Sequence, residues 1–161
     1  MATYTSKSYA VTEVGQPLEV KHTEIPPLEG TQVLVQNKFA GICHSDLHIW
    51  EGEIGGNKFS PKVPFVLGHE MEGVVVAVGP EVKDTSVIGK QFALYPWLGC
   101  DKGVCAYCVP GTYNLCDKPD TQRFVDGKSM FGGYASHVVI PDPKYLMNTE
   151  GALPEGERRV F

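Results

Sequence analysis

The sequence predicts a mainly β domain, organised as a barrel or a sandwich. The chain has 161 residues, the usual size of one domain, with 42% hydrophobic and 20% charged residues. Its 18 glycines and 12 prolines are many for this length and are typical of a fold with frequent turns. Between the turns, valine, isoleucine, phenylalanine and tyrosine recur in short runs, and strands at such spacing favour a barrel or sandwich.

Six segments alternate or run apolar over the length of a strand. In chain order, the expected strands lie within residues 6–15, 18–25, 31–43, 65–79, 87–96 and 134–141. The stretches between them, such as IPPLEG and GPEVKD, carry the glycine, proline and aspartate residues that form turns. A short helix is expected over residues 44–52, with Ser45 or Asp46 as its N-terminal cap.

The stretch 96–131 does not alternate, and a loop of that size inside a compact domain needs something to hold it. The cysteines inside this stretch suggest that a metal ion holds it. We expect one domain over residues 1–147, with a metal-held lobe at 96–120. The polar, proline-containing segment 148–161 resembles a linker more than a final strand.

Charge and hydropathy exclude several classes of partner. The formal net charge is −5, and the basic residues form no run that could follow a phosphate backbone, so nucleic acid is not expected. No segment has the apolar length of a signal peptide or a membrane span. We therefore expect a cytoplasmic protein, in which thiols stay reduced.

Four of the five cysteines lie close together in the sequence. Cys100, Cys105, Cys108 and Cys116 are separated by four, two and seven residues. Structural zinc prefers four thiolates, and a two-residue gap lets neighbouring cysteines bend around one ion. The spacing therefore predicts a closed, structural zinc site. The alternatives are buried free cysteines or a redox-active CxxC pair at 105 and 108, which no thioredoxin-like pattern supports.

The fifth cysteine points to a second site. Cys43, His69 and Glu70 could lie at the ends of two neighbouring strands. A thiolate, an imidazole and an oxygen with one position left open form the arrangement of a catalytic zinc site. Taken singly, a cysteine is more often part of the core and a histidine a satisfied polar group.

Three motifs, in this order, resemble the zinc-dependent medium-chain alcohol dehydrogenases. GICHSDLH resembles the family's Cys-hydroxyl-Asp-His segment, GHEMEG followed by VVVAVG resembles its zinc signature, and the WLGC to NLC segment resembles its structural-zinc lobe. The signature match includes the glycines Gly68, Gly73 and Gly79. The resemblance is to the GroES-like catalytic domain, near the microbial and cinnamyl alcohol dehydrogenase branches. It implies a GroES-like β-barrel with a few short helices and a zinc-stapled lobe.

The resemblance also implies a catalytic zinc site with Cys43 and His69 as ligands. Glu70 would be the neighbouring carboxylate that replaces water on the metal during turnover. Asp46 would accept the second ring N–H of His69 and thereby orient the imidazole.

A proton relay and two binding surfaces follow from the same resemblance. Ser45 would pass the proton of the substrate, and His48 would be the outer end of the relay. His44 matches the position that contacts the pyrophosphate of the cofactor. Trp97 and Ile54 are candidates for the substrate wall, although Trp97 could equally be a packing residue.

The implied reaction is the interconversion of alcohols with aldehydes or ketones by hydride transfer, with zinc and with NAD or NADP. Small-molecule alcohols and aldehydes are the expected partners. The alternative, from a different class, is a non-enzymatic zinc-stabilised β-barrel used for binding or assembly.

The chain departs from the family pattern in three respects. It has no G-x-G-x-x-G turn, so we expect a chain truncated before the dinucleotide-binding (Rossmann) domain and weakly active or inactive by itself. The family's third ligand to the catalytic zinc would follow the last residue. The gap of four residues between Cys100 and Cys105 is longer than the usual two. Loss of a partner domain would also expose apolar surface, which predicts a homo-oligomer.

Overall fold

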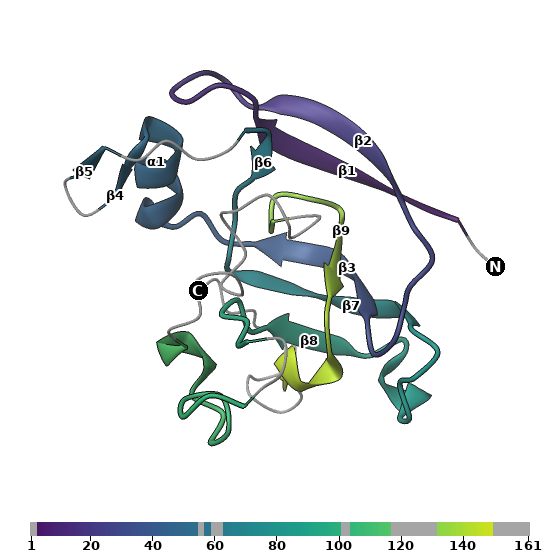
Figure 1. Cartoon of the computed structure of the whole chain (residues 1–161). Coiled ribbons are helices and arrows are strands. Elements are labelled where there is room, and N and C mark those ends of the chain that lie inside the picture. Colours follow the sequence, from purple (N-terminus) through teal and green to yellow (C-terminus); the bar gives the residue numbers. More distant parts are fainter. Residues whose placement is uncertain (1–2, 55–56, 59–62, 101–103, 117–131, 150–161) are drawn as a thin grey trace.

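The computed structural model describes residues 3–54, 57–58, 63–100, 104–116 and 132–149 (Figure 1). Strands make up 39% of the structure and helices 14%, and the predicted mainly β class is confirmed. The strands are β1 (Tyr4–Val11), β2 (Glu19–Ile25), β3 (Val33–Ala40), β4 (Glu53–Ile54), β5 (Asn57–Lys58), β6 (Phe65–Val66), β7 (Met71–Val78), β8 (Gln91–Leu94), β9 (His137–Ile140) and β10 (Leu146–Asn148). The helices are α1 (His44–Glu51) and the 3₁₀ turns η1 (Thr85–Val87), η2 (Tyr113–Leu115) and η4 (Pro143–Tyr145).

Two antiparallel sheets enclose the core. The smaller has the order β2-β1-β6 and the larger β10-β8-β7-β3-β9, while β4 and β5 form a separate hairpin next to α1. Figure 1 shows β1 and β2 running across the larger sheet, with α1 beside β6. The strand β3, which lies between β7 and β9, has Val33, Leu34 and Val35 fully buried. Because both faces of β3 are covered, its sequence is a continuous apolar run at this point.

Buried serines join the two sheets where regular strand pairing stops. Ser6 and Ser8 of β1 are almost fully buried, and Ser8 forms an isolated bridge to Ala135. The Ser6 hydroxyl donates to the carbonyl of His137 at 3.2 Å and accepts from its N–H at 3.3 Å. These hydroxyl contacts satisfy backbone groups that would otherwise be buried without partners, and they bring β1 and β9 together.

The strand expected over residues 65–79 is in fact two strands, and the prediction of one strand was wrong. β6 belongs to the smaller sheet and β7 to the larger sheet. The residues between them, Leu67 to Glu70, cross from one sheet to the other, and Gly68 has a φ of +95°. A residue with a β-carbon would be strained at that φ, so the glycine permits the chain to cross between the sheets.

Helix α1 begins where the sequence predicts it, but neither Ser45 nor Asp46 is its cap. The N-cap is Cys43, and the carboxylate of Asp46, in the first turn, accepts the backbone N–H of Cys43 at 3.1 Å. Gly52 ends the helix with a φ of +77°. Among the described helices, none is long and apolar enough to cross a membrane.

The predicted division into a domain of residues 1–147 and a tail of 148–161 stays a prediction. β10 pairs with β8 and ends at Asn148, so the first residue of the predicted tail is part of a strand. Residues 150–161 lie outside the described residues.

The stability of the fold should fall in acid because of His137 in β9. Burial, aided by the charge of Lys38, lowers the pKa of His137 below its ordinary value of 6.5. The unfolded chain therefore binds this proton more readily, and the contribution to stability is present above about pH 6.5 and lost as the pH falls through the folded-state value. Urea unfolding across this range should show a shallower pH dependence for His137→Gln than for the wild type. Equal slopes for the two proteins would contradict this prediction.

Candidate functional site

The four clustered cysteines meet in one place. Ligand atoms of Cys100, Cys105, Cys108 and Cys116 all lie within 4.8 Å of one another, and the sulfurs of Cys105 and Cys116 are 3.8 Å apart. Three of the four are buried, with Tyr113 packed against them. Residues 101–103 and 117–120 of the predicted lobe lie outside the described residues. A single four-sulfur cluster fits one tetrahedral ion better than it fits scattered core cysteines or an isolated CxxC pair.

Backbone groups in the lobe are aimed at the sulfur atoms. The N–H of Cys100 donates to Cys108 Sγ at 3.3 Å, and the N–H of Cys108 donates to Cys105 Sγ at 3.4 Å. A backbone hydrogen bond from Cys105 lowers the pKa of Cys100 to about 6, whereas burial raises the pKa of Cys108 to about 12. The donors favour thiolates, but burying several thiolates side by side requires a cation. The donor set therefore fits zinc.

The second cluster lies where two paired strands end. Ligand atoms of Cys43, His69 and Glu70 are all within 4.8 Å of one another. Ala40 at the end of β3 pairs with Met71 at the start of β7. The N–H of Gly41 then donates to the carbonyl of Glu70 at 2.8 Å, which brings the two following segments together. The structure thus brings together the three residues that the sequence singled out, while metal binding by them stays a prediction.

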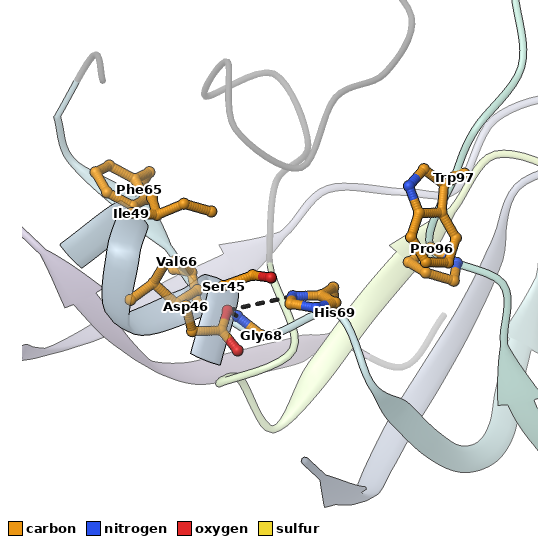
Figure 2. A pocket seen from close by; sticks show the side chains of 10 residues that line it. Ser45, Asp46, Ile49, Phe65, Val66, Gly68, His69, Pro96 and Trp97 are labelled. Carbon is orange, nitrogen blue, oxygen red and sulfur yellow. Dashed lines mark hydrogen bonds and ion pairs between the residues drawn. The ribbon is translucent and has the colours of Figure 1, made fainter. Parts of the chain in front are cut away.

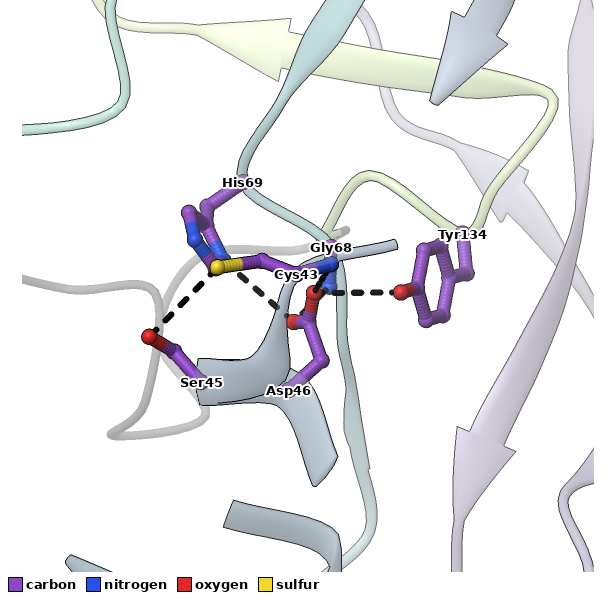
Figure 3. Close-up of polar contacts among 6 residues, drawn as sticks. All are labelled: Cys43, Ser45, Asp46, Gly68, His69 and Tyr134. Carbon is purple, nitrogen blue, oxygen red and sulfur yellow. Dashed lines mark hydrogen bonds and ion pairs between the residues drawn. The ribbon is translucent and has the colours of Figure 1, made fainter. Parts of the chain in front are cut away.

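Asp46 connects this cluster to the helix and to the crossing segment (Figure 3). It is 3% exposed. One oxygen, Oδ1, accepts the N–H of Gly68 at 2.9 Å and lies 3.3 Å from Nδ1 of His69. Because Nδ1 faces Asp46, the other ring nitrogen, Nε2, is free to act as a ligand. This is the contact that the predicted orienting role of Asp46 requires.

The second oxygen of Asp46 has a partner that the sequence analysis missed. The hydroxyl of Tyr134 donates to Oδ2 at 3.1 Å (Figure 3). The sequence contains one indication of this contact, the pair Gly132 and Gly133 directly before Tyr134. In the structure, a β-carbon on Gly133 would lie 2.9 Å from the backbone of Gly68. The glycines indicate a close approach of backbones, but a single sequence does not say which segment they approach.

Glu70, the third member of the cluster, has a carboxylate with a buried oxygen. Its Oε2 is buried and, within the part of the chain that the structure describes, has no hydrogen-bond partner. A buried carboxylate oxygen without a donor is costly, and a nearby cation would compensate for it. Together with the thiol of Cys43 and the imidazole of His69, the carboxylate of Glu70 fits a zinc ion with an open position.

The predicted relay residues lie on exposed positions of α1. The oxygen of Ser45 is 3.5 Å from the sulfur of Cys43. His48 lies one turn further along, and its ring stacks on that of His44 with centroids 4.6 Å apart. The helix therefore carries Ser45 at the metal cluster, with the two histidines beside it.

A cavity of about 280 Å³ opens next to the cluster (Figure 2). Ser45, Asp46 and His69 line it on one side, and Trp97 and Pro96 on the other. Its remaining lining consists of Ile49, Phe65, Val66, Leu67 and Gly68. An apolar hollow with a few polar groups at one end suits a small organic molecule. The side chain of Ile54, the other predicted wall residue, lies outside the described part of the structure.

Comparison with known proteins identifies the family. The model of the alcohol dehydrogenase GroES-like domain matches residues 29–150. The chain belongs to this family. The predicted resemblance to the zinc-dependent alcohol dehydrogenases, and with it the GroES-like fold, is thereby confirmed.

Individual relatives agree with the family assignment. An NAD-dependent alcohol dehydrogenase from Sulfurisphaera tokodaii is 38% identical over 144 residues, which cover 87% of this chain and 40% of the relative. A cobalt- and zinc-bound thermostable alcohol dehydrogenase from Pyrobaculum aerophilum superposes with a TM-score of 0.72 at 29% identity, covering 94% of this chain and 44% of that one. An acetophenone reductase from Geotrichum candidum in complex with NAD has a TM-score of 0.75 at 29% identity, covering 93% and 41%.

The GroES-like chain spans about 40% of the length of the curated relatives that it matches. Its similarity therefore concerns only that part of those enzymes.

Proposed function

We propose that this chain is the catalytic domain of a zinc- and NAD(P)-dependent alcohol dehydrogenase that interconverts alcohols with aldehydes or ketones. The observation that carries the proposal is the Cys43, His69 and Glu70 cluster at the edge of a largely apolar cavity. Neither a purely structural zinc site nor an assembly module requires an open ligand position beside such a hollow.

Cys43 and His69 would hold the catalytic zinc, with Glu70 as the adjacent carboxylate. When bound, zinc supplies Lewis acidity at the substrate oxygen, and the nicotinamide supplies or accepts the hydride. Asp46 faces Nδ1 of His69 and favours the proton there, so that the lone pair of Nε2 would be available to the metal. Trp97 and Phe65, which line the cavity, would lie beside the apolar part of the substrate.

Ser45 is the proton carrier in this proposal. Its hydroxyl lies at the cavity, 3.5 Å from Cys43 Sγ, where it can accept the proton of an alcohol and pass it toward solvent. His48, exposed on the same helix, is the outer acceptor. His44, stacked on His48, is the proposed contact of the pyrophosphate of NAD or NADP.

Replacing Ser45 by alanine should lower the rate of alcohol oxidation by about 10²–10⁴-fold, the usual contribution of a positioned acid-base group. The measurement is alcohol-dependent reduction of NAD or NADP by the protein that carries this chain. Ser86→Ala, a serine in η1, is the matched control and should leave the rate unchanged. Zinc-loaded protein that oxidises no alcohol with either cofactor would instead favour a non-enzymatic binding module.

We also propose that the four-cysteine lobe holds a structural zinc, that the protein forms homo-oligomers and that it resides in the cytoplasm. Strongly exposed apolar side chains support self-association: Ile42, Val104 and Val109 are 86%, 71% and 72% exposed. The free state of all five thiols fits a reducing compartment.

A further inference from the structure

Tyr134 contacts both segments that build the predicted catalytic metal site. Its hydroxyl donates to Asp46 Oδ2 at 3.1 Å, and its N–H donates to the carbonyl of Leu67 at 2.8 Å. Its ring lies against Gly68, where an added β-carbon would be 2.7 Å from Cδ1 of the tyrosine. One residue, located just before β9, therefore holds both Asp46 on α1 and the segment that carries His69.

The carboxylate of Asp46 is buried and depends on these donors. The N–H of Cys43 and the hydroxyl of Tyr134 share Oδ2, while the N–H of Gly68 and Nδ1 of His69 face Oδ1. Charge-assisted hydrogen bonds of this kind are stronger than neutral ones and direct the acceptor geometrically. Without the tyrosine, the N–H of Cys43 is the one donor to Oδ2 that remains among the described residues, and the carboxylate is freer to rotate away from the imidazole.

The hydroxyl of Tyr134 is a donor throughout the neutral pH range. Burial, reinforced by the negative charge of Asp46, raises the pKa of Tyr134 well above its ordinary value of 10. The tyrosine therefore keeps its proton, and Asp46 is the acceptor in this contact.

We propose that Tyr134 is a positioning residue for the metal ligand His69 and acts through Asp46. The inference rests on the proposed zinc site at Cys43 and His69. With Oδ2 held by the tyrosine, Oδ1 stays on Nδ1 of His69, the proton stays on that nitrogen, and Nε2 stays available as a ligand. Outer partners of metal-binding histidines contribute about 10–100-fold in metal affinity, and this is the effect assigned to the Tyr134 hydroxyl.

Tyr134→Phe tests the proposal because it removes the hydroxyl and keeps the ring that packs on Gly68. The protein is first given enough zinc to fill the four-thiolate site and is then titrated with Co²⁺. Binding is monitored through the thiolate-to-cobalt charge-transfer absorption, for which Cys43 supplies the thiolate. Tyr134→Phe should bind this cobalt about 10–100-fold more weakly than the wild type. Tyr4→Phe is the matched control, because the Tyr4 hydroxyl donates to the carbonyl of Val76, away from the site. It should bind cobalt as the wild type does.

A second readout does not depend on metal. Nitrogen NMR of the His69 ring in the metal-free protein should report the Nδ1–H tautomer in the wild type and in Tyr4→Phe, and a mixture of tautomers in Tyr134→Phe. A merely structural role of the tyrosine would lower the melting temperature without changing the tautomer.

The outcomes separate the two proposals. Equal cobalt affinity and the same tautomer in wild type and Tyr134→Phe would overturn the role of Tyr134 while leaving the metal site intact. If the wild type shows no cobalt absorption that Cys43→Ser abolishes, the metal site itself is wrong, and the role of Tyr134 falls with it.

Discussion

Cys105→Ser should release one zinc ion and make the lobe between Gly99 and Cys116 sensitive to protease. The four sulfurs lie within 4.8 Å of one another, and structural zinc binding of this type contributes on the order of 10 kcal/mol to ordering its loop, less the entropy that the loop loses. Little else in the described part of the lobe could replace that free energy, because Val104, Val109 and Leu115 are exposed rather than packed.

Limited proteolysis with mass analysis of the fragments, alongside zinc determination, measures this effect. Chelation of the wild-type protein should reproduce the digestion pattern of the variant. Cys43→Ser is the matched control, since it removes a thiol outside the lobe and should leave the lobe protected. An unchanged digestion pattern in metal-free protein would show that packing alone orders the lobe.

His69→Ala should remove the second zinc ion and, with it, alcohol oxidation. The imidazole is both a member of the three-residue cluster and the partner of Asp46 at 3.3 Å. Loss of a direct ligand should weaken zinc by more than the roughly 10–100-fold that loss of an outer partner costs. Zinc per chain should therefore fall from two ions to one, with the lobe still protected.

The matched control for this variant is His22→Ala, which changes an exposed histidine of β2. It should keep both ions and the activity of the wild type. Two zinc ions in His69→Ala, or one ion in the wild type, would contradict the assignment of a catalytic site to this cluster.

Local patterns predicted most of the strands because each strand's periodicity reflects its own burial. The run around Val33 to Val35 was recognised because a strand that is buried on both faces is apolar on both. The hairpin of β4 and β5 and the strand β10 were not predicted, because segments of two or three residues carry no measurable period.

The strand predicted over 65–79 was wrong for a different reason. Its residues are suitable for a strand throughout, and only the packing of β1 on β6 and of β3 on β7 decides that the chain changes sheets at Gly68. Likewise, Ser45 and Asp46 have the chemistry of helix caps. In the folded molecule, however, Asp46 receives donors from Gly68 and Tyr134, which are remote in the sequence.

The sequence by itself determined the ligand chemistry: four thiols with close spacing, and a separate thiol, imidazole and carboxylate in motifs of one enzyme family. This information is local, because the type of each ligand and the spacing between ligands can be read directly from the sequence. Only the tertiary structure decided that Glu70 has a buried oxygen with no hydrogen-bond partner among the described residues, that the cavity lies beside His69, and that Tyr134 reaches Asp46. These features depend on contacts between distant segments, whose register is determined by the packing of the whole barrel and not by any one stretch of chain.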